Sequence, residues 1–85
     1  MNTMSDENRK LIIDIGITVA EFRNKKKISQ ETLAEKSGIH RTYLSEVEGG
    51  KRNPTISVLN KIVLALEVSM SEFFERVEER GKNGQ

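Results

Sequence analysis

Residues 29–53, SQETLAEKSGIHRTYLSEVEGGKRN, predict two short helices joined by a tight turn. Ser29 suits the N-cap of the first helix, expected over residues 30–36, because its hydroxyl can accept a hydrogen bond from a first-turn amide. Gly38 follows as a residue that easily adopts the positive φ of a helix stop. The second helix is expected over residues 41–48, where Leu44 and Val47 lie three apart on one inward face. The segment therefore predicts a helix-turn-helix arrangement.

In such an arrangement the second helix can enter the DNA major groove. The opening and the exit of the segment resemble the Xre family of phage-repressor and Cro-like regulators. The matching positions are Ser29, Gln30, Leu33, Ala34, Gly38, Glu48, Gly50, Lys51, Arg52, Asn53 and Pro54, continuing through Leu59, Ile62, Ala65, Leu66, Val68 and Ser69 to Phe73. The similarity covers roughly residues 15–74.

Three further helices are expected around this motif. Apolar residues at three- and four-residue steps predict a helix over residues 8–26, with Ile12, Ile15, Val19 and Phe22 inward and Leu11, Ile13, Ile17 and Ala20 widening the same face. Gly16 is interpreted as allowing the close approach of another helix. Thr55 is the expected N-cap of a helix with the inward residues Ile56, Leu59, Ile62, Val63 and Leu66. Ser69 and Glu72 form a capping-box pattern before a last helix at 70–80.

The predicted fold class is all-α, a compact five-helix bundle of the lambda-repressor-like DNA-binding kind that the resemblance implies. Residues 8–80 are expected to form a single domain with its motif at 29–49, between a flexible N-terminus at 1–7 and a flexible tail at 81–85. The resemblance also marks Glu67 as a departure, because many relatives carry glycine there. A positive φ at this position would strain a residue with a Cβ.

The composition sets broad limits. The 85 residues contain no cysteine, so a disulfide framework and a thiolate zinc site are excluded. No apolar run is long enough for a bilayer and no signal peptide is evident, so we expect a cytoplasmic protein. The net charge is only +1, but residues 23–61 hold nine Lys or Arg and four Glu, a balance of +5. Each flank has a balance of −2, so the basic charge gathers around the motif.

The start of the second motif helix is expected to read base edges. Arg41 is the best candidate because a guanidinium can bond guanine O6 and N7 together. Thr42 offers a hydroxyl or a methyl group, and Glu46 can accept from cytosine N4 or else orient Arg41. His40 completes the set of base-contacting residues. It is the only histidine, and it has neither the partners for a metal site nor a nucleophile to activate.

Further residues are expected to contact the DNA backbone: Arg23, Gln30, Tyr43, Ser45, Lys51, Arg52 and Asn53. The resemblance assigns Gln30 to a phosphate, and it implies an ion pair between Arg23 and Glu48 that joins the first helix to the third. Two alternatives remain open. Tyr43 can instead pack its ring against the domain, and Arg52 can enter the minor groove instead of binding phosphate.

One recognition helix covers few base pairs, so a homodimer on a palindrome is expected. The resemblance implies that Phe73 fills the core, whereas Phe74 points about 100° away on the helix and suits an interface. The expected dimer contact is on the last helix and the end of the fourth: Phe74, Met70, Val77, Leu64 and Glu67. The alternatives are that both rings share one core, or that the interface uses the first helix.

The expected function is a sequence-specific, double-stranded DNA-binding transcription regulator. Its segments Arg41–Tyr43, Lys51–Asn53 and 66–74 resemble controller proteins of restriction–modification systems. The alternatives are a protein-interaction module such as an antitoxin, or a repressor of a phage or mobile element. We expect no catalytic residue, no cofactor, no metal, no membrane partner and no small-molecule ligand. The operator, the target genes and the sign of regulation are not encoded in any recognisable pattern.

Overall fold

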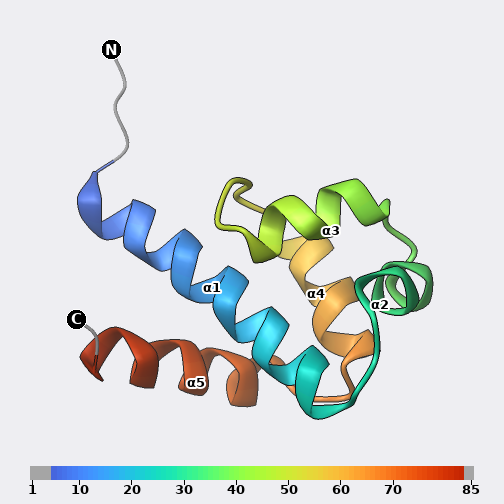
Figure 1. Cartoon of the computed structure of the whole chain (residues 1–85). Helices are drawn as coiled ribbons and strands as arrows, with labels where there is room; N and C mark the ends of the chain where they lie inside the picture. The colour runs from blue at the N-terminus through green and yellow to red at the C-terminus, as the bar shows by residue number, and fades with distance from the viewer. Residues whose placement is uncertain (1–4, 84–85) are drawn as a thin grey trace.

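The computed structural model describes residues 5–83, which form five helices and no strand (Figure 1). They are α1 Asp6–Lys25, α2 Gln30–Ser37, α3 Arg41–Glu48, α4 Ile56–Ala65 and α5 Met70–Asn83. Figure 1 shows α5 running back alongside α1, while α2, α3 and α4 pack together at the other end of the molecule. The prediction of an all-α five-helix fold is confirmed, and no described helix is long and apolar enough to cross a membrane.

Helix boundaries differ from the expected ones at both ends of the chain. α1 begins two residues early because the Ser5 hydroxyl accepts from the Asn8 amide at 3.2 Å and caps it. α5 continues to Asn83, so residues 81–83 are helical and were wrongly placed in a tail. Packing against α1 supports this last turn in spite of the low helix propensity of Gly81. The remaining expected tail, 84–85, and residues 1–4 lie outside the described residues.

Most helix starts are capped by a side chain, as expected. Ser29 accepts from the Thr32 amide at 3.0 Å, Thr55 from Val58 at 3.2 Å and Ser69 from Glu72 at 3.0 Å. In the described part of the chain the Glu72 side chain makes no return bond to Ser69, so only half of the predicted capping box forms. The start of α3 differs from the others, because His40 occupies its N-cap and makes no side-chain capping bond.

The core lies where all five helices meet. Phe73 is fully buried at its centre, with the Phe22 ring at 6.1 Å and the Phe74 ring edge-on at 5.3 Å. Around it are Ile15, Val19, Leu33, Ala34, Leu44, Val47, Leu59, Ile62, Val63, Leu66 and Val77. The inward stripe of the first helix is therefore confirmed for Ile12, Ile15 and Val19.

Several apolar residues expected in the core are exposed. Leu11, Ile13 and Ile17 are 41–45% exposed, and Ala20 is half-buried. The helical repeat of 3.6 residues places Ile13 and Ile17 on a side of α1 that neither α3 nor α5 covers, whereas Leu11 lies in an open groove between α1 and α5. Ile56 is 66% exposed because it is the first residue of α4, at the outer edge of the bundle.

Gly16 lies at the crossing of α1 and α3. A Cβ atom at this position would come within 2.2 Å of the Val47 carbonyl oxygen and 2.9 Å of the Glu48 carbonyl oxygen. The two backbones therefore touch directly, and the interpretation of Gly16 as a close-approach residue is confirmed. This contact fixes how far the C-terminal end of α3 stands from α1.

Two turns place residues with side chains in the left-handed region. Lys27 after α1 has φ 59° and Glu67 after α4 has φ 64°. Glu67 therefore adopts the strained positive φ considered above for this position. Each turn is followed by an apolar residue and a serine N-cap, Ile28-Ser29 and Val68-Ser69. Lys26 Nζ joins the turns by contacting Glu67 Oε1 at 2.7 Å.

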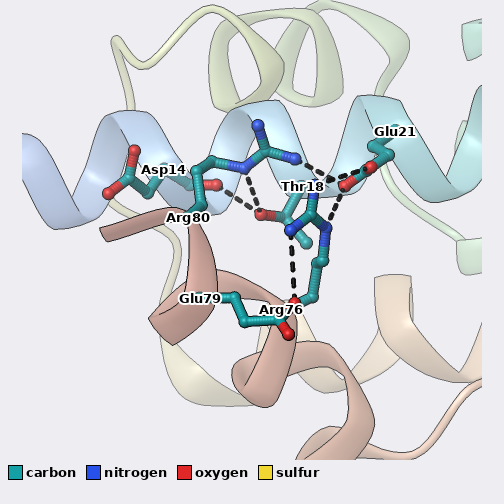
Figure 2. Close-up of polar contacts among 6 residues, drawn as sticks. All are labelled: Asp14, Thr18, Glu21, Arg76, Glu79 and Arg80. Atoms are coloured by element: carbon teal, nitrogen blue, oxygen red, sulfur yellow. Dashed lines mark hydrogen bonds and ion pairs between the residues drawn. The ribbon is translucent and has the colours of Figure 1, made fainter. Parts of the chain in front are cut away.

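Two arginines of α5 reach across to α1, as Figure 2 shows. Arg76 donates from Nε and Nη2 to the two carboxylate oxygens of Glu21, at 2.9 and 3.0 Å. Arg80 donates to the same carboxylate and, from Nε, to the Thr18 hydroxyl at 3.3 Å. The bond from Arg76 holds the pKa of Glu21 below its ordinary 4.5, although burial opposes the shift. The Thr18 hydroxyl in turn donates to the Asp14 backbone carbonyl at 2.6 Å. These hydrogen bonds together hold α5 against α1.

Candidate nucleic-acid interface

The outer face of α3 is polar and open. Arg41, Thr42 and Ser45 are exposed, and together with Glu46 they line a shallow hollow on the surface. Leu44 and Val47 of the same helix are fully buried and anchor it to the core. The helix therefore presents hydrogen-bonding side chains outward from a rigid base, the arrangement that reading base edges in a groove requires.

An ion pair fixes the end of α3 to α1. Arg23 donates to Glu48 from Nε to Oε2 at 2.7 Å and from Nη2 to Oε1 at 3.0 Å. The side chains are only 14% and 6% exposed, and the Glu48 contact raises the pKa of Arg23. Arg23 Nη1 also donates to the Ile28 carbonyl at 2.8 Å, so three of its five N–H groups have protein partners.

Gln30 joins the same cluster. Its Nε2 donates to Glu48 Oε1 at 2.9 Å, so the Glu48 carboxylate on α3 accepts hydrogen bonds from α1, through Arg23, and from α2, through Gln30. Gln30 is the first residue of α2, half-buried, and its amide group is held near the start of that helix. This residue thus links α2 to α3, a contact that the sequence resemblance did not include.

A second cluster forms where the loop after α3 turns back. Arg52 donates from Nε and Nη2 to Glu46 Oε1, at 3.1 and 2.6 Å, and its Cζ lies 4.9 Å from the centre of the Tyr43 ring. The hydrogen bond from Arg52 to Glu46 raises the pKa of Arg52. The suggestion that Glu46 orients Arg41 is wrong, because its carboxylate holds Arg52. The Tyr43 ring is half-buried against the core, as the packing alternative required.

The loop itself carries basic and polar groups. Lys51, Arg52 and Asn53 are exposed, whereas Pro54 is buried and ends the loop at the core. Gly50 adopts φ 74° and passes close to the Ile13 side chain of α1. Arg9 of α1 lines a hollow with the three loop residues. Sequence reasoning missed Arg9, although a cation on the first helix outside its apolar stripe was the available signal.

The residues expected at a dimer contact divide into two groups. Val77 is only 4% exposed and belongs to the core of its own chain, so its assignment to the interface is wrong. Its helical position turns it toward α1, where α5 packs. Leu64 is 64% exposed, Met70 and Phe74 are half-buried, and the exposed Glu67 contacts Lys26. Phe74 also lines an apolar groove between α1 and α5 with Leu11 and Val77.

Residues 5–83 hold no group of three or more His, Cys, Asp or Glu side chains arranged to bind a metal ion. His40 is exposed at the start of α3, next to Arg41.

The fold and the exposed helix together define a small helix-turn-helix protein. The sequence profile of the family described as helix-turn-helix matches residues 19–73, and the chain belongs to this family. The control protein C.SmaI of Serratia marcescens is 45% identical over 58 residues, which cover 68% of this chain and 69% of that protein.

Solved structures show the same likeness. The wild-type restriction-modification controller protein C.Esp1396I has a TM-score of 0.82 and 37% identity, covering 86% of this chain and 96% of its own. A structure of C.Esp1396I bound to a 25 base pair operator site has a TM-score of 0.81, with the same identity and coverage. The resemblance to Xre-like regulators, and among them to controller proteins, is therefore confirmed.

Proposed function

We propose that this protein is a sequence-specific transcription regulator that binds a palindromic operator in double-stranded DNA as a homodimer. The single observation that carries the proposal is α3, which presents Arg41, Thr42 and Ser45 outward while Leu44 and Val47 fix it to the core. The likeness to control protein C.SmaI and to C.Esp1396I supports a role as a controller protein of a restriction–modification system.

In this proposal the start of α3 reads the bases. Arg41 bonds guanine O6 and N7, Thr42 contacts a neighbouring base, and His40 lies at the groove edge. Both Arg41 and Thr42 are exposed, and the described residues provide neither with a side-chain hydrogen bond. Their polar groups are therefore available to DNA without first breaking a protein contact.

The backbone contacts flank this helix on two sides. Gln30 and Arg23 present their remaining N–H groups beside the start of α2, where the positive end of the helix favours phosphate. Tyr43, Ser45, Lys51, Arg52 and Asn53 contact phosphates along the other edge. Arg9 adds a cation beside Lys51. Contacts with phosphates position the protein on the duplex, whereas contacts with base edges read its sequence.

The dimer is proposed to form through α5 and the end of α4. Leu64 is a large aliphatic residue 64% exposed, and the half-buried Met70 and Phe74 lie on the following helix. Two copies related by a two-fold axis would place their α3 helices about 34–36 Å apart, one turn of DNA. We further propose that this regulator has no catalytic step and acts in the cytoplasm.

The test is a mobility shift with the purified protein. A duplex is first selected from a random-sequence library with the wild-type protein, and a scrambled duplex of the same composition serves as the control. We expect the selected duplex to contain an inverted repeat and to bind at least a thousandfold more tightly, within the usual range of specificity ratios. Equal binding of both duplexes at every salt concentration would refute the proposal.

Lys51 provides a check on the backbone contacts. Replacement of Lys51 by alanine should weaken the selected and scrambled duplexes by similar factors and lower the salt slope by about one, because one phosphate contact is lost. A loss confined to the selected duplex would instead assign Lys51 to base reading.

A further inference from the structure

Glu46 is an anionic residue in a surface proposed to meet a polyanion. Its side chain is 39% exposed, and it lines the same hollow as Arg41, Thr42 and Ser45. A carboxylate here repels phosphates, so its presence on the outer face of α3 requires a specific reason.

Its partner is the loop residue Arg52. Arg52 donates hydrogen bonds from Nε and Nη2 to the same oxygen of Glu46, Oε1, and the Tyr43 ring lies under its guanidinium group. Oε2 of Glu46 accepts no hydrogen bond from any residue that the structure describes. Arg52 is 48% exposed, and ion pairs between such exposed groups contribute little to stability. Fold stability is therefore a weak explanation for the pair.

We propose that Glu46 determines specificity by occupying Arg52 in the free protein, so that Arg52 does not strengthen the binding of DNA of arbitrary sequence. The inference rests on the DNA-binding function proposed above. Glu46 takes two of the five N–H groups of Arg52, so a phosphate on arbitrary DNA that binds the others lies beside the Glu46 carboxylate. A phosphate that displaces Glu46 leaves that carboxylate unpaired beside the negative backbone. The gain from the phosphate contact is then offset by the repulsion between like charges.

A duplex with a hydrogen-bond donor opposite Glu46 changes this balance. The cytosine N4 amine points into the major groove and is a natural donor to a carboxylate. Where it meets Glu46, Arg52 is released to a phosphate and both charged groups keep a partner. The exchange of one internal ion pair for two contacts with DNA is thus favourable only at the matching sequence.

The experiment compares four proteins: the wild type, Glu46→Gln, Arg52→Ala and the double variant. Each is titrated against the duplex selected by the wild-type protein and against its scrambled control, over a range of salt concentrations. Glutamine keeps the size of the side chain while removing its charge. The Glu75→Gln variant on α5 makes the same charge change at an exposed position outside the proposed DNA interface, and Glu75 is not among the residues proposed for the dimer contact.

We expect Glu46→Gln to bind the scrambled duplex several-fold more tightly than the wild type and to lose part of its preference for the selected duplex. The released arginine should make the salt slope steeper by about one phosphate, so the gain shrinks about threefold between roughly 50 and 200 mM salt. The gain should vanish when Arg52 is also replaced, which a double-mutant cycle measures directly. Glu75→Gln should leave the preference unchanged.

An unchanged or higher preference in Glu46→Gln overturns the inference, as does a gain on scrambled DNA that persists without Arg52. The second result would mean that Glu46 acts only by its own repulsion of phosphates. Failure of the wild type to prefer its selected duplex is a separate outcome, since it refutes the proposed function before any variant is compared. A purely structural role of Glu46 would lower the affinity for both duplexes equally and would also overturn the inference.

Discussion

Replacement of Gly16 by alanine tests the direct contact between the backbones of α1 and α3. In an unconstrained helix this change stabilises by about 0.8–1 kcal/mol, because alanine is the better helix former. Here the new Cβ would lie 2.2 Å from the Val47 carbonyl oxygen, whereas ordinary contact begins near 3.4 Å. The two helices would have to separate by about 1 Å to restore van der Waals contact.

The obstacle is a pair of backbone carbonyls, which cannot rotate away as a side chain can. Overpacking a core typically costs about 1–3 kcal/mol, and this site belongs at the upper end of that range. After subtraction of the helix-propensity gain, we expect a net loss of about 2 kcal/mol in the free energy of unfolding. The measurement is urea denaturation followed by circular dichroism, at one protein concentration because dimerisation makes stability concentration-dependent.

Gly81→Ala on α5 is the matched control. A Cβ there would meet only Asp14 Oδ2 at 3.7 Å and Lys10 Nζ at 3.9 Å, which are ordinary contacts. This variant should be unchanged or stabilised by up to about 1 kcal/mol. If Gly16→Ala is as stable as the wild type while Gly81→Ala behaves as expected, the claim that backbone contact sets the α1–α3 distance is refuted.

Four other outcomes are expected. Glu48→Gln should cost about 3 kcal/mol of unfolding free energy, since it leaves the mostly buried Arg23 charge uncompensated, and an unchanged denaturation midpoint would contradict this. The lowered pKa of Glu21 contributes stability that is fully present above its ordinary pKa of 4.5 and is lost as the pH falls through the lower folded value. Glu21→Gln should therefore make the free energy of unfolding depend less on pH across that acidic window. Arg41→Ala should lose about 1–3 kcal/mol on the selected duplex and relax one position per half-site, whereas an equal loss on scrambled DNA would exclude base reading. Phe74→Ser should sediment as a folded monomer at micromolar concentration, and a folded dimer would place the interface elsewhere, most simply on α1.

Sequence periodicity predicted the fold well because the helices are amphipathic and carry recognisable ends. The spacing of Ile12, Ile15 and Val19 identified one buried stripe, and Ser29, Gly38 and Thr55 marked boundaries through their capping chemistry. The same periodicity could not tell which neighbours cover a wide apolar face. Ile13 and Ile17 therefore seemed inward, although they lie on a side of α1 that neither α3 nor α5 covers.

The polar contacts divide in the same way. The Arg23–Glu48 pair was anticipated through resemblance, since helical geometry alone cannot join residues 25 positions apart. Orienting Arg41 was one of the two roles expected for Glu46, but the positive φ of Gly50 turns the chain back and brings Arg52 to Glu46 instead. The bonds from Arg76 and Arg80 to Glu21 depend on the antiparallel packing of α5 on α1, which no local pattern encodes.

α1 makes both of the contacts that matter for the spacing of the two DNA-reading heads. Through Gly16 and Arg23 it meets α3, and through Thr18 and Glu21 it meets α5, all within about two turns of one helix. α1 therefore connects α5, which carries part of the proposed dimer contact, rigidly to the recognition helix α3. In the proposed dimer, a small tilt of α1 at its contact with α5 would change the distance between the two α3 helices, so the spacing of the half-sites would depend on how rigidly α1 connects them.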